Sequence, residues 1–297
     1  MGIRFGINPI VWSNDDLRTL GGDTPLETCL SETKQAGYDG IELGHKFPRV
    51  AAQLRPILER NGLALVSGWY SSNLLERSAE DEIKALHAHY ELLQTLGCKV
   101  LILAETTAAV HCEVKVPLSR RPTLGDEKWP LLGERMTQVG DWLQARGMHL
   151  AYHHHMGTVV QTADEVDRLM TSTGASVGLL LDTGHLTYAG ADPLAVARRW
   201  ANRIVHVHLK DVRQRVLKEM NKIDAPFLHA VPAGVFTVPG DGDVVYPPIF
   251  AELAKVKYQG WLVVEAEQDP KQAHPFTYAR KGFQNSVSLA RNAGLIS

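Results

Sequence analysis

The chain has 297 residues, 44% hydrophobic and 22% charged, which is typical of a folded protein with a large core and argues against disorder. The formal net charge of −2 shows no basic excess, so we expect a small-molecule partner and no nucleic acid. The N-terminus has no basic segment followed by an apolar one, and no apolar run is long enough to span a bilayer. Since the three cysteines contain no C-x-x-C pair, we expect a cytoplasmic protein with free thiols and no membrane contact.

Eight short apolar runs alternate with segments of helical period along the chain. The apolar positions of 132–143 follow the spacing of an amphipathic helix. Thr162 to Glu165 has the composition of a capping box, and Asp192-Pro193 is a typical helix start. The predicted strands cover residues 3–8, 40–44, 64–68, 99–104, 149–154, 177–182, 204–209 and 261–267.

This alternation predicts the α/β class. Apolar runs separated by helices indicate parallel strands joined by right-handed crossovers. Eight such units favour a single (β/α)₈ TIM barrel over residues 1–297, and neither G-x-G-x-x-G nor a P-loop supports an open nucleotide-binding sheet. Two long connections, 105–129 and 212–243, are expected to be active-site loops.

Polar residues gather where the predicted strands end. In such a barrel the active site lies at the C-terminal ends of the strands, so these residues are the site candidates. They are Asn8, Glu42, Glu105, His153, His154, His155, Asp182, His185, His206, His208, Lys210, Glu265 and Glu267.

Side-chain alternation sorts these candidates, because residues two apart on a strand share a face. His153 and His155 are expected to point into the barrel, and His154 away from it. Imidazole and carboxylate groups from neighbouring strands form a mixed nitrogen and oxygen set, which suits Mn²⁺, Co²⁺, Zn²⁺ or Fe²⁺ better than Mg²⁺ or Ca²⁺. The alternative is that individual histidines are structural, although unpaired charges there would cost several kcal/mol.

Nucleophilic catalysis has less support. The chain contains no G-x-S-x-G elbow, and no cysteine lies beside a histidine at a strand end. His111 and Cys112 are adjacent, but they fall within the connection 105–129. We therefore give this pair no primary role.

Several long blocks resemble the inosose dehydratases, a family within the xylose-isomerase-like barrels, over nearly the whole chain. The blocks are GINPIVWSNDD, GIELGHKFP, PLSRRP, AYHHHMGTVVQT, LDTGHLTYAG, HVHLKDVR, VFTVPGDGDV and GWLVVEAEQDP. The resemblance implies a hydro-lyase that removes water from 2-keto-myo-inositol and forms a trihydroxycyclohexane-dione by way of an enolate.

The resemblance also implies one divalent metal ion, most readily Mn²⁺ or Co²⁺, with Zn²⁺ or Fe²⁺ as alternatives. The wider group holds its metal with Glu, Asp, His and Glu, and matching strand ends place the last three on Asp182, His208 and Glu265. By this resemblance, His153 stands where the wider group has the first Glu. It is expected either to bind the metal as a neutral imidazole or to take a catalytic role instead. Glu267 is a reserve ligand, and the resemblance leaves glutathione or another thiol open as a second cofactor.

The implied elimination needs a base for a carbon-bound proton and an acid for the departing hydroxyl. His155 and His185 are the first candidates for these roles, followed by Lys210 and Glu42, and His155 is equally a candidate for merely supporting a ligand. A polyhydroxylated cyclic ketone also needs polar or stacking contacts around its rim. The candidates for those contacts are Asn8, Trp12, Lys46, Trp69 and Arg213.

Three other functions remain open. An isomerase or epimerase would share the metal and the enolate, a nuclease of the endonuclease IV kind is disfavoured by the charge balance, and a carbohydrate-binding barrel would perform no chemistry. Assembly into a homo-oligomer is also open.

Overall fold

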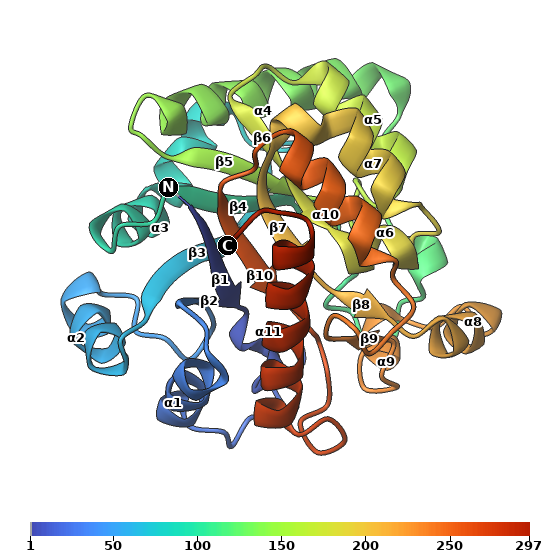
Figure 1. Ribbon diagram of the computed structural model, residues 1–297. Coiled ribbons are helices and arrows are strands. Elements are labelled where there is room, and N and C mark those ends of the chain that lie inside the picture. Colours follow the sequence, from blue (N-terminus) through green and yellow to red (C-terminus); the bar gives the residue numbers. More distant parts are fainter. Residues whose placement is uncertain (1) are drawn as a thin grey trace.

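The protein is a closed eight-stranded parallel barrel, as predicted (Figure 1). This computed structural model describes residues 2–297. Around the barrel the strands run in the order β1, β10, β7, β6, β5, β4, β3 and β2. Their bounds are β1 (Ile3–Ile7), β2 (Gly40–Leu43), β3 (Ala64–Ser72), β4 (Val100–Glu105), β5 (His149–His153), β6 (Val177–Asp182), β7 (Ile204–Leu209) and β10 (Gly260–Val264).

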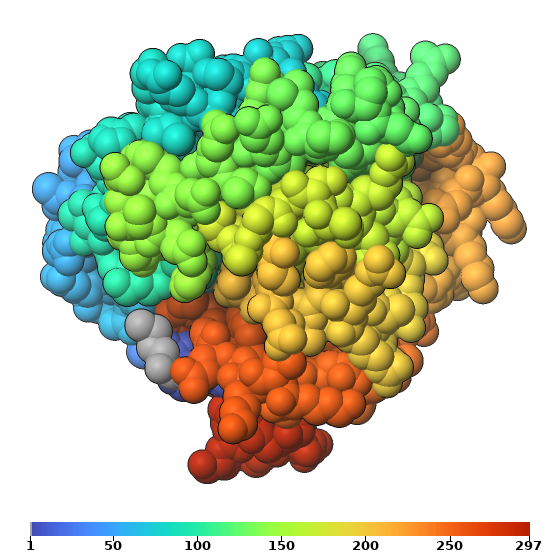
Figure 2. Space-filling model, turned by 90° about the horizontal axis from the view of Figure 1, so that it is seen from above, coloured from blue at the N-terminus to red at the C-terminus, as the bar shows by residue number. Residues whose placement is uncertain are grey.

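Helices cover the outside of the barrel. Thr162 and Glu165 form the predicted capping box, and the Asp192 side chain caps the helix that begins at Pro193. In Figure 2, segments that follow one another in the sequence lie side by side across the surface, as the colour passes from green to orange. The helices are α1 (Leu26–Ala36), α2 (Ala51–Asn61), α3 (Ala79–Thr95), α4 (Trp129–Gln144), α5 (Ala163–Ser172), α6 (Thr183–Tyr188), α7 (Pro193–Trp200), α10 (Tyr246–Lys255) and α11 (Pro275–Asn292).

The barrel interior changes from apolar to polar along its axis. Ile102, Ala151 and Leu180 belong to one small buried apolar cluster inside the strands. Two residues further along their strands, on the same face, are His153 and Asp182, both buried. Along these two strands the interior thus changes from apolar side chains to polar ones at the barrel mouth.

The two long connections differ in how much regular secondary structure they contain. Residues 105–129 contain only short 3-10 turns, at Leu118–Arg120 and Asp126–Lys128. The second connection is more structured than a loop: β8 (Asp211–Val212) pairs antiparallel with β9 (Phe236–Thr237), and α8 (Gln214–Lys222) and α9 (Phe227–Ala230) lie between them. It also contributes Phe227 and Phe236 to a separate apolar cluster. Within residues 2–297, none of the helices combines the length and apolarity needed to cross a membrane.

Candidate metal centre

A pocket of about 220 Å³ opens at the C-terminal ends of the strands. This volume is below that of pockets for drug-sized ligands, so the pocket suits one small ring. Its wall includes eight of the residues expected from the sequence: Asn8, Glu42, Trp69, His153, His155, His208, Glu265 and Glu267.

Four side chains converge at the base of this pocket, and we call them the floor cluster: His153, Asp182, His208 and Glu265. Each offers one ligand atom, and these atoms all lie within 4.8 Å of one another. They come from β5, β6 and β7 and from the residue after β10, four neighbouring strands of the barrel. The structure therefore brings together the four residues predicted as ligands, whereas Glu267 belongs to a neighbouring group with His155 and His185.

The donor atoms of the floor cluster fit a metal ion better than they fit one another. His208 Nδ1 lies 2.7 Å from Glu265 Oε2 and 3.5 Å from Asp182 Oδ2, as ion-pair contacts, yet none of these three buried atoms has an aligned hydrogen bond. Buried polar atoms normally form such bonds, so three that face a common centre without one need an explanation. A divalent cation bound among them would supply it.

His153 has the tautomer of a metal ligand. Its Nδ1 lies 2.6 Å from the carbonyl oxygen of His154, to which it donates, leaving the Nε2 lone pair directed towards Asp182 Oδ2, 3.7 Å away. Burial, helped by the charge of His208, holds the pKa of His153 well below its ordinary value. A neutral imidazole at this position can therefore act as a metal ligand through Nε2.

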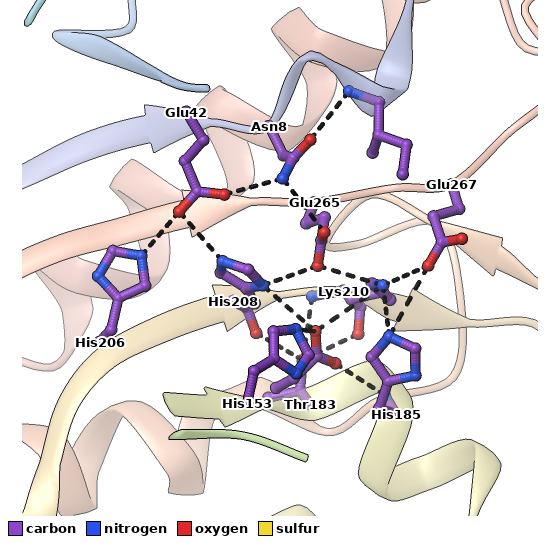
Figure 3. Close-up of polar contacts among 12 residues, drawn as sticks. Asn8, Glu42, His153, Thr183, His185, His206, His208, Lys210, Glu265 and Glu267 are labelled. Carbon is purple, nitrogen blue, oxygen red and sulfur yellow. Dashed lines mark hydrogen bonds and ion pairs between the residues drawn. The ribbon is translucent and has the colours of Figure 1, made fainter. Parts of the chain in front are cut away.

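His208 is oriented by a carboxylate on the opposite side of its ring (Figure 3). Its Nε2 donates to Glu42 Oε1 at 3.2 Å, and the same oxygen accepts from His206 at 2.9 Å. Burial raises the pKa of Glu42, but His208 and His206 outweigh it and lower that pKa to about 2. Glu42 therefore stays ionised and fixes the His208 ring with Nδ1 facing the floor cluster, as in carboxylate–histidine–metal sites. Against the effect of burial, Glu265 and Glu42 raise the pKa of His208 well above its ordinary value, so a metal ion would replace a proton on Nδ1.

Lys210 is a fully buried cation beside the floor cluster. Its ammonium donates to Glu267 at 2.7 Å and to His185 Nε2 at 2.9 Å, and lies 3.2 Å from Glu265 (Figure 3). Burial would lower the pKa of Lys210, but Glu265 and Glu267 raise it above its ordinary value. Lys210 thus remains charged and does not line the pocket, a position suited to fixing carboxylates rather than exchanging protons with a ligand.

The two histidines expected to act as acid and base differ in their access to the pocket. His155 lines the pocket, donates from Nδ1 to the carbonyl of Met156 at 2.8 Å, and so keeps Nε2 as an acceptor. Burial holds its pKa well below the ordinary value. The His185 ring packs behind it at a tilt of 45°, with ring centroids 3.9 Å apart, and its Nε2 accepts from Lys210. The geometry gives His155 access to a ligand and His185 a supporting position.

His154 and Glu267 are the two remaining candidates next to the floor cluster, and they face different ways. His154 is fully buried, and its Nε2 accepts a long, 3.4 Å hydrogen bond from the backbone N–H of Asp182 rather than facing the pocket, as alternation predicts. Glu267 does face the pocket, and burial raises its pKa to about 7 against the lowering effect of Lys210. A carboxyl group that can carry a proton therefore lies in the pocket wall.

Only two of the five expected substrate contacts line the pocket. Asn8 bridges Glu42 and Glu265 with its amide, at 2.8 and 3.3 Å, and Trp69 packs edge-on against His153 and His155.

The other three expectations, for Trp12, Lys46 and Arg213, are not met, because these side chains have other partners. Trp12 is buried and bonds Glu32, Lys46 binds the carbonyl groups of Gly21, Gly22 and Thr24, and Arg213 binds Asp241 and the backbone of Gly234. Sequence proximity to a strand end does not reveal such local bonds.

Sequence reasoning missed the outer wall of the pocket. Its charged residues lie on the connections after β1, β2 and β4, where no periodicity fixes the direction of a side chain. They are Asp15, Asp16, Arg18, His45, Arg49 and His111.

The fold and this strand-end site are those of a known class. Residues 30–288 match the family model described as xylose isomerase-like TIM barrel, and the chain belongs to that family.

Within the family the chain is 51% identical over 294 residues to the rhizopine catabolism protein MocC of Rhizobium meliloti, covering 99% of this chain and 90% of the relative. It is 44% identical to an inosose dehydratase of Geobacillus thermodenitrificans, covering 95% of both chains. Among solved structures, an IOLI protein with a bound zinc atom matches with a TM-score of 0.65 and 16% identity, over 98% of this chain and 99% of that one. That last likeness concerns the fold alone.

Proposed function

We propose that this protein is an inosose dehydratase, a hydro-lyase that removes water from 2-keto-myo-inositol and forms a trihydroxycyclohexane-dione. One observation carries the proposal: a pocket with convergent histidines and carboxylates lies in a chain that is 44% identical to an inosose dehydratase over 95% of its length. The 51% identity to the rhizopine catabolism protein MocC makes a role in rhizopine catabolism a second candidate.

The floor cluster would hold one divalent ion through His153, Asp182, His208 and Glu265. Two imidazoles and two carboxylates favour Mn²⁺ or Co²⁺, and also accommodate Zn²⁺ or Fe²⁺. When bound, the ion supplies a Lewis acid that stabilises the negative charge developing next to a ketone. Glu42 and Lys210 keep the ligands in position from behind.

Two residues of the pocket wall are assigned the proton transfers. His155, neutral and with a free Nε2, takes the proton from carbon. Glu267, oriented by Lys210, delivers a proton to the hydroxyl that leaves from the adjacent carbon. His185 supports His155 from behind, and so moves from candidate acid or base to a positioning role.

Asn8 and Trp69 are the proposed contacts to the polyol ring, since both line the pocket. The connections 105–129 and 212–243 are proposed as walls of the active site, because His111 of the first lines the pocket and Phe227 of the second packs on the His155 ring. A cytoplasmic location is supported by three free cysteines. A thiol cofactor and a homo-oligomer remain predictions, to be measured by thiol dependence of turnover and by light scattering.

The test is incubation of chelated protein, resupplied with Mn²⁺ or Co²⁺, with scyllo-inosose. A dehydratase forms an ultraviolet-absorbing product lighter by one water, whereas an isomerase or epimerase conserves mass. Binding without conversion under every metal would contradict the proposal and favour a carbohydrate-binding barrel.

Solvent deuterium separates the two proton transfers. His155→Gln should lose both deuterium exchange at carbon and elimination, while Glu267→Gln should retain exchange and lose elimination. Equal loss of exchange in both variants would contradict the assignment.

A further inference from the structure

A second group of potential metal ligands lies at the pocket entrance, and we call it the rim cluster: Asp16, His111 and Cys112. Their donor atoms lie within 4.8 Å of one another. Asp16 follows β1, whereas His111 and Cys112 belong to the connection after β4, so two segments far apart in sequence meet here. Asp16 and His111 both line the same pocket as the floor cluster.

The backbone presents these three side chains on fixed turns. Asn14 Oδ1 accepts from the N–H groups of Asp16 and Leu17, at 2.9 and 2.6 Å, which holds the first turn. In the second, the N–H of Val110 donates to the carbonyl of Gly157 at 2.9 Å. A side chain at position 157, where φ is +79°, would come within 2.8 Å of the backbone nitrogen of His111, so only glycine allows this approach.

The polar atoms of the rim cluster have few partners. His111 is only 8% exposed, and its Nδ1 has no hydrogen-bond partner. The Cys112 thiol is free, and it makes a long contact of 3.4 Å with Asp16 Oδ1. A thiol is a weak donor, so it compensates poorly for the burial of a carboxylate. Consistent with this, burial raises the pKa of Asp16 despite the nearby His111.

We infer that Asp16, His111 and Cys112 form a second metal site, which binds a thiophilic divalent ion such as Zn²⁺ or Co²⁺. One sulfur, one nitrogen and one oxygen ligand are a donor set typical of such ions, and three protein ligands leave a coordination position open to the pocket. The Cys112 thiol releases its proton to solvent when the ion binds. The inference does not depend on the proposed reaction, because it concerns binding alone.

The two sites differ in the ions they accept. Thiolate selects Zn²⁺ and Co²⁺ over Mn²⁺, whereas the floor cluster contains no sulfur. The protein should therefore bind one equivalent of Mn²⁺ but two equivalents of Co²⁺ or Zn²⁺. His111 also lies against His155, with ring centroids 5.2 Å apart, so the second ion sits on the wall that carries the proposed base.

The experiment is titration of the metal-free protein with Co²⁺, followed by absorbance and by equilibrium dialysis. A cobalt–thiolate bond gives a near-ultraviolet charge-transfer band, which the floor cluster cannot produce. Cys112→Ser should remove this band and one equivalent of Co²⁺ while keeping the other. Cys112 is exposed, so the substitution leaves the core untouched, and circular dichroism verifies the fold.

Two further variants make the result decisive. Asp182→Asn should lose the other equivalent and retain the band, which separates failure of the floor cluster from failure of the rim cluster. Cys98→Ser, at a buried thiol elsewhere, should change neither. Absence of the band in the wild type, or a band that survives Cys112→Ser, would overturn the inference.

Discussion

The floor and the rim of the pocket both offer imidazole and carboxylate ligand atoms, and the rim adds a thiol, but the two clusters hold these atoms differently. In the floor cluster each imidazole has a second partner: His153 donates to a backbone carbonyl and His208 to Glu42. In the rim cluster His111 Nδ1 has none, and Cys112 has one long contact. Strand ends thus orient their ligands through bonds to the barrel, whereas the rim depends on two turns. We expect substitutions in the floor to affect turnover most and those near the rim to have smaller, local effects.

The largest effect is expected from Asp182→Asn. Loss of a ligand carboxylate removes the Lewis acid, and because that is worth several kcal/mol, turnover should fall by roughly a thousandfold or more. Metal content measured by mass spectrometry of metal ions should fall with it. His149→Gln, at the exposed opposite end of β5, is the matched control and should retain both. If Asp182→Asn kept its full metal content, the floor cluster would not be the site that binds the catalytic metal.

His155→Gln tests the pocket wall between the two clusters. The variant should lose about 100- to 10,000-fold in turnover, the usual contribution of a general base. Its content of floor metal should be unchanged, because His155 is outside the floor cluster. Turnover near that of the wild type would assign His155 to support alone.

Glu42→Gln tests how firmly the barrel holds its ligands. Glu42 is not among the floor ligands but accepts from His208, so the metal dissociation constant should rise by about 10- to 100-fold. Competition with a chelator measures this constant. An unchanged constant would mean that the floor, like the rim, does not need a supporting carboxylate.

The smallest effect concerns the connection that carries the rim. Arg121 ties this connection to α5 through Glu165 at 2.7 Å and to the carbonyl of Thr158 at 3.1 Å. Both side chains of the ion pair are mostly buried, so Arg121→Ala should lower the free energy of unfolding by about 1–2 kcal/mol, measured by urea denaturation. Arg168→Ala breaks a largely exposed ion pair with Asp126 and should change the free energy of unfolding little. Equal losses would show that burial is not what matters here.

The same contrast explains what could be predicted from the sequence. The apolar runs and their alternation predicted all eight barrel strands, and they also predicted that His153 points inward and that polar side chains gather at the strand ends. The alternation of side chains along a strand makes such predictions possible, because residues two apart must share a face.

The sequence could not place residues whose direction is set by a turn. The turn before Asp16 is held by Asn14, a local pattern that does not fix where the Asp16 side chain points. His111 packs against Gly157, a contact between distant residues that no sequence spacing predicts. Trp12, Lys46 and Arg213 lie near strand ends yet bond elsewhere, since local carbonyl and carboxylate partners capture them. The role of Glu42 behind His208 also depends on a contact across the barrel, between residues 166 positions apart.

The central claim is that one divalent ion sits in the floor cluster. Anomalous scattering from a crystal of the Mn²⁺-loaded protein tests it most directly, since Mn²⁺ should occupy the floor and not the rim. We predict a single strong peak bounded by His153 Nε2, Asp182 Oδ2, His208 Nδ1 and Glu265 Oε2. A peak among His155, His185 and Glu267, or none in the pocket, would contradict the claim.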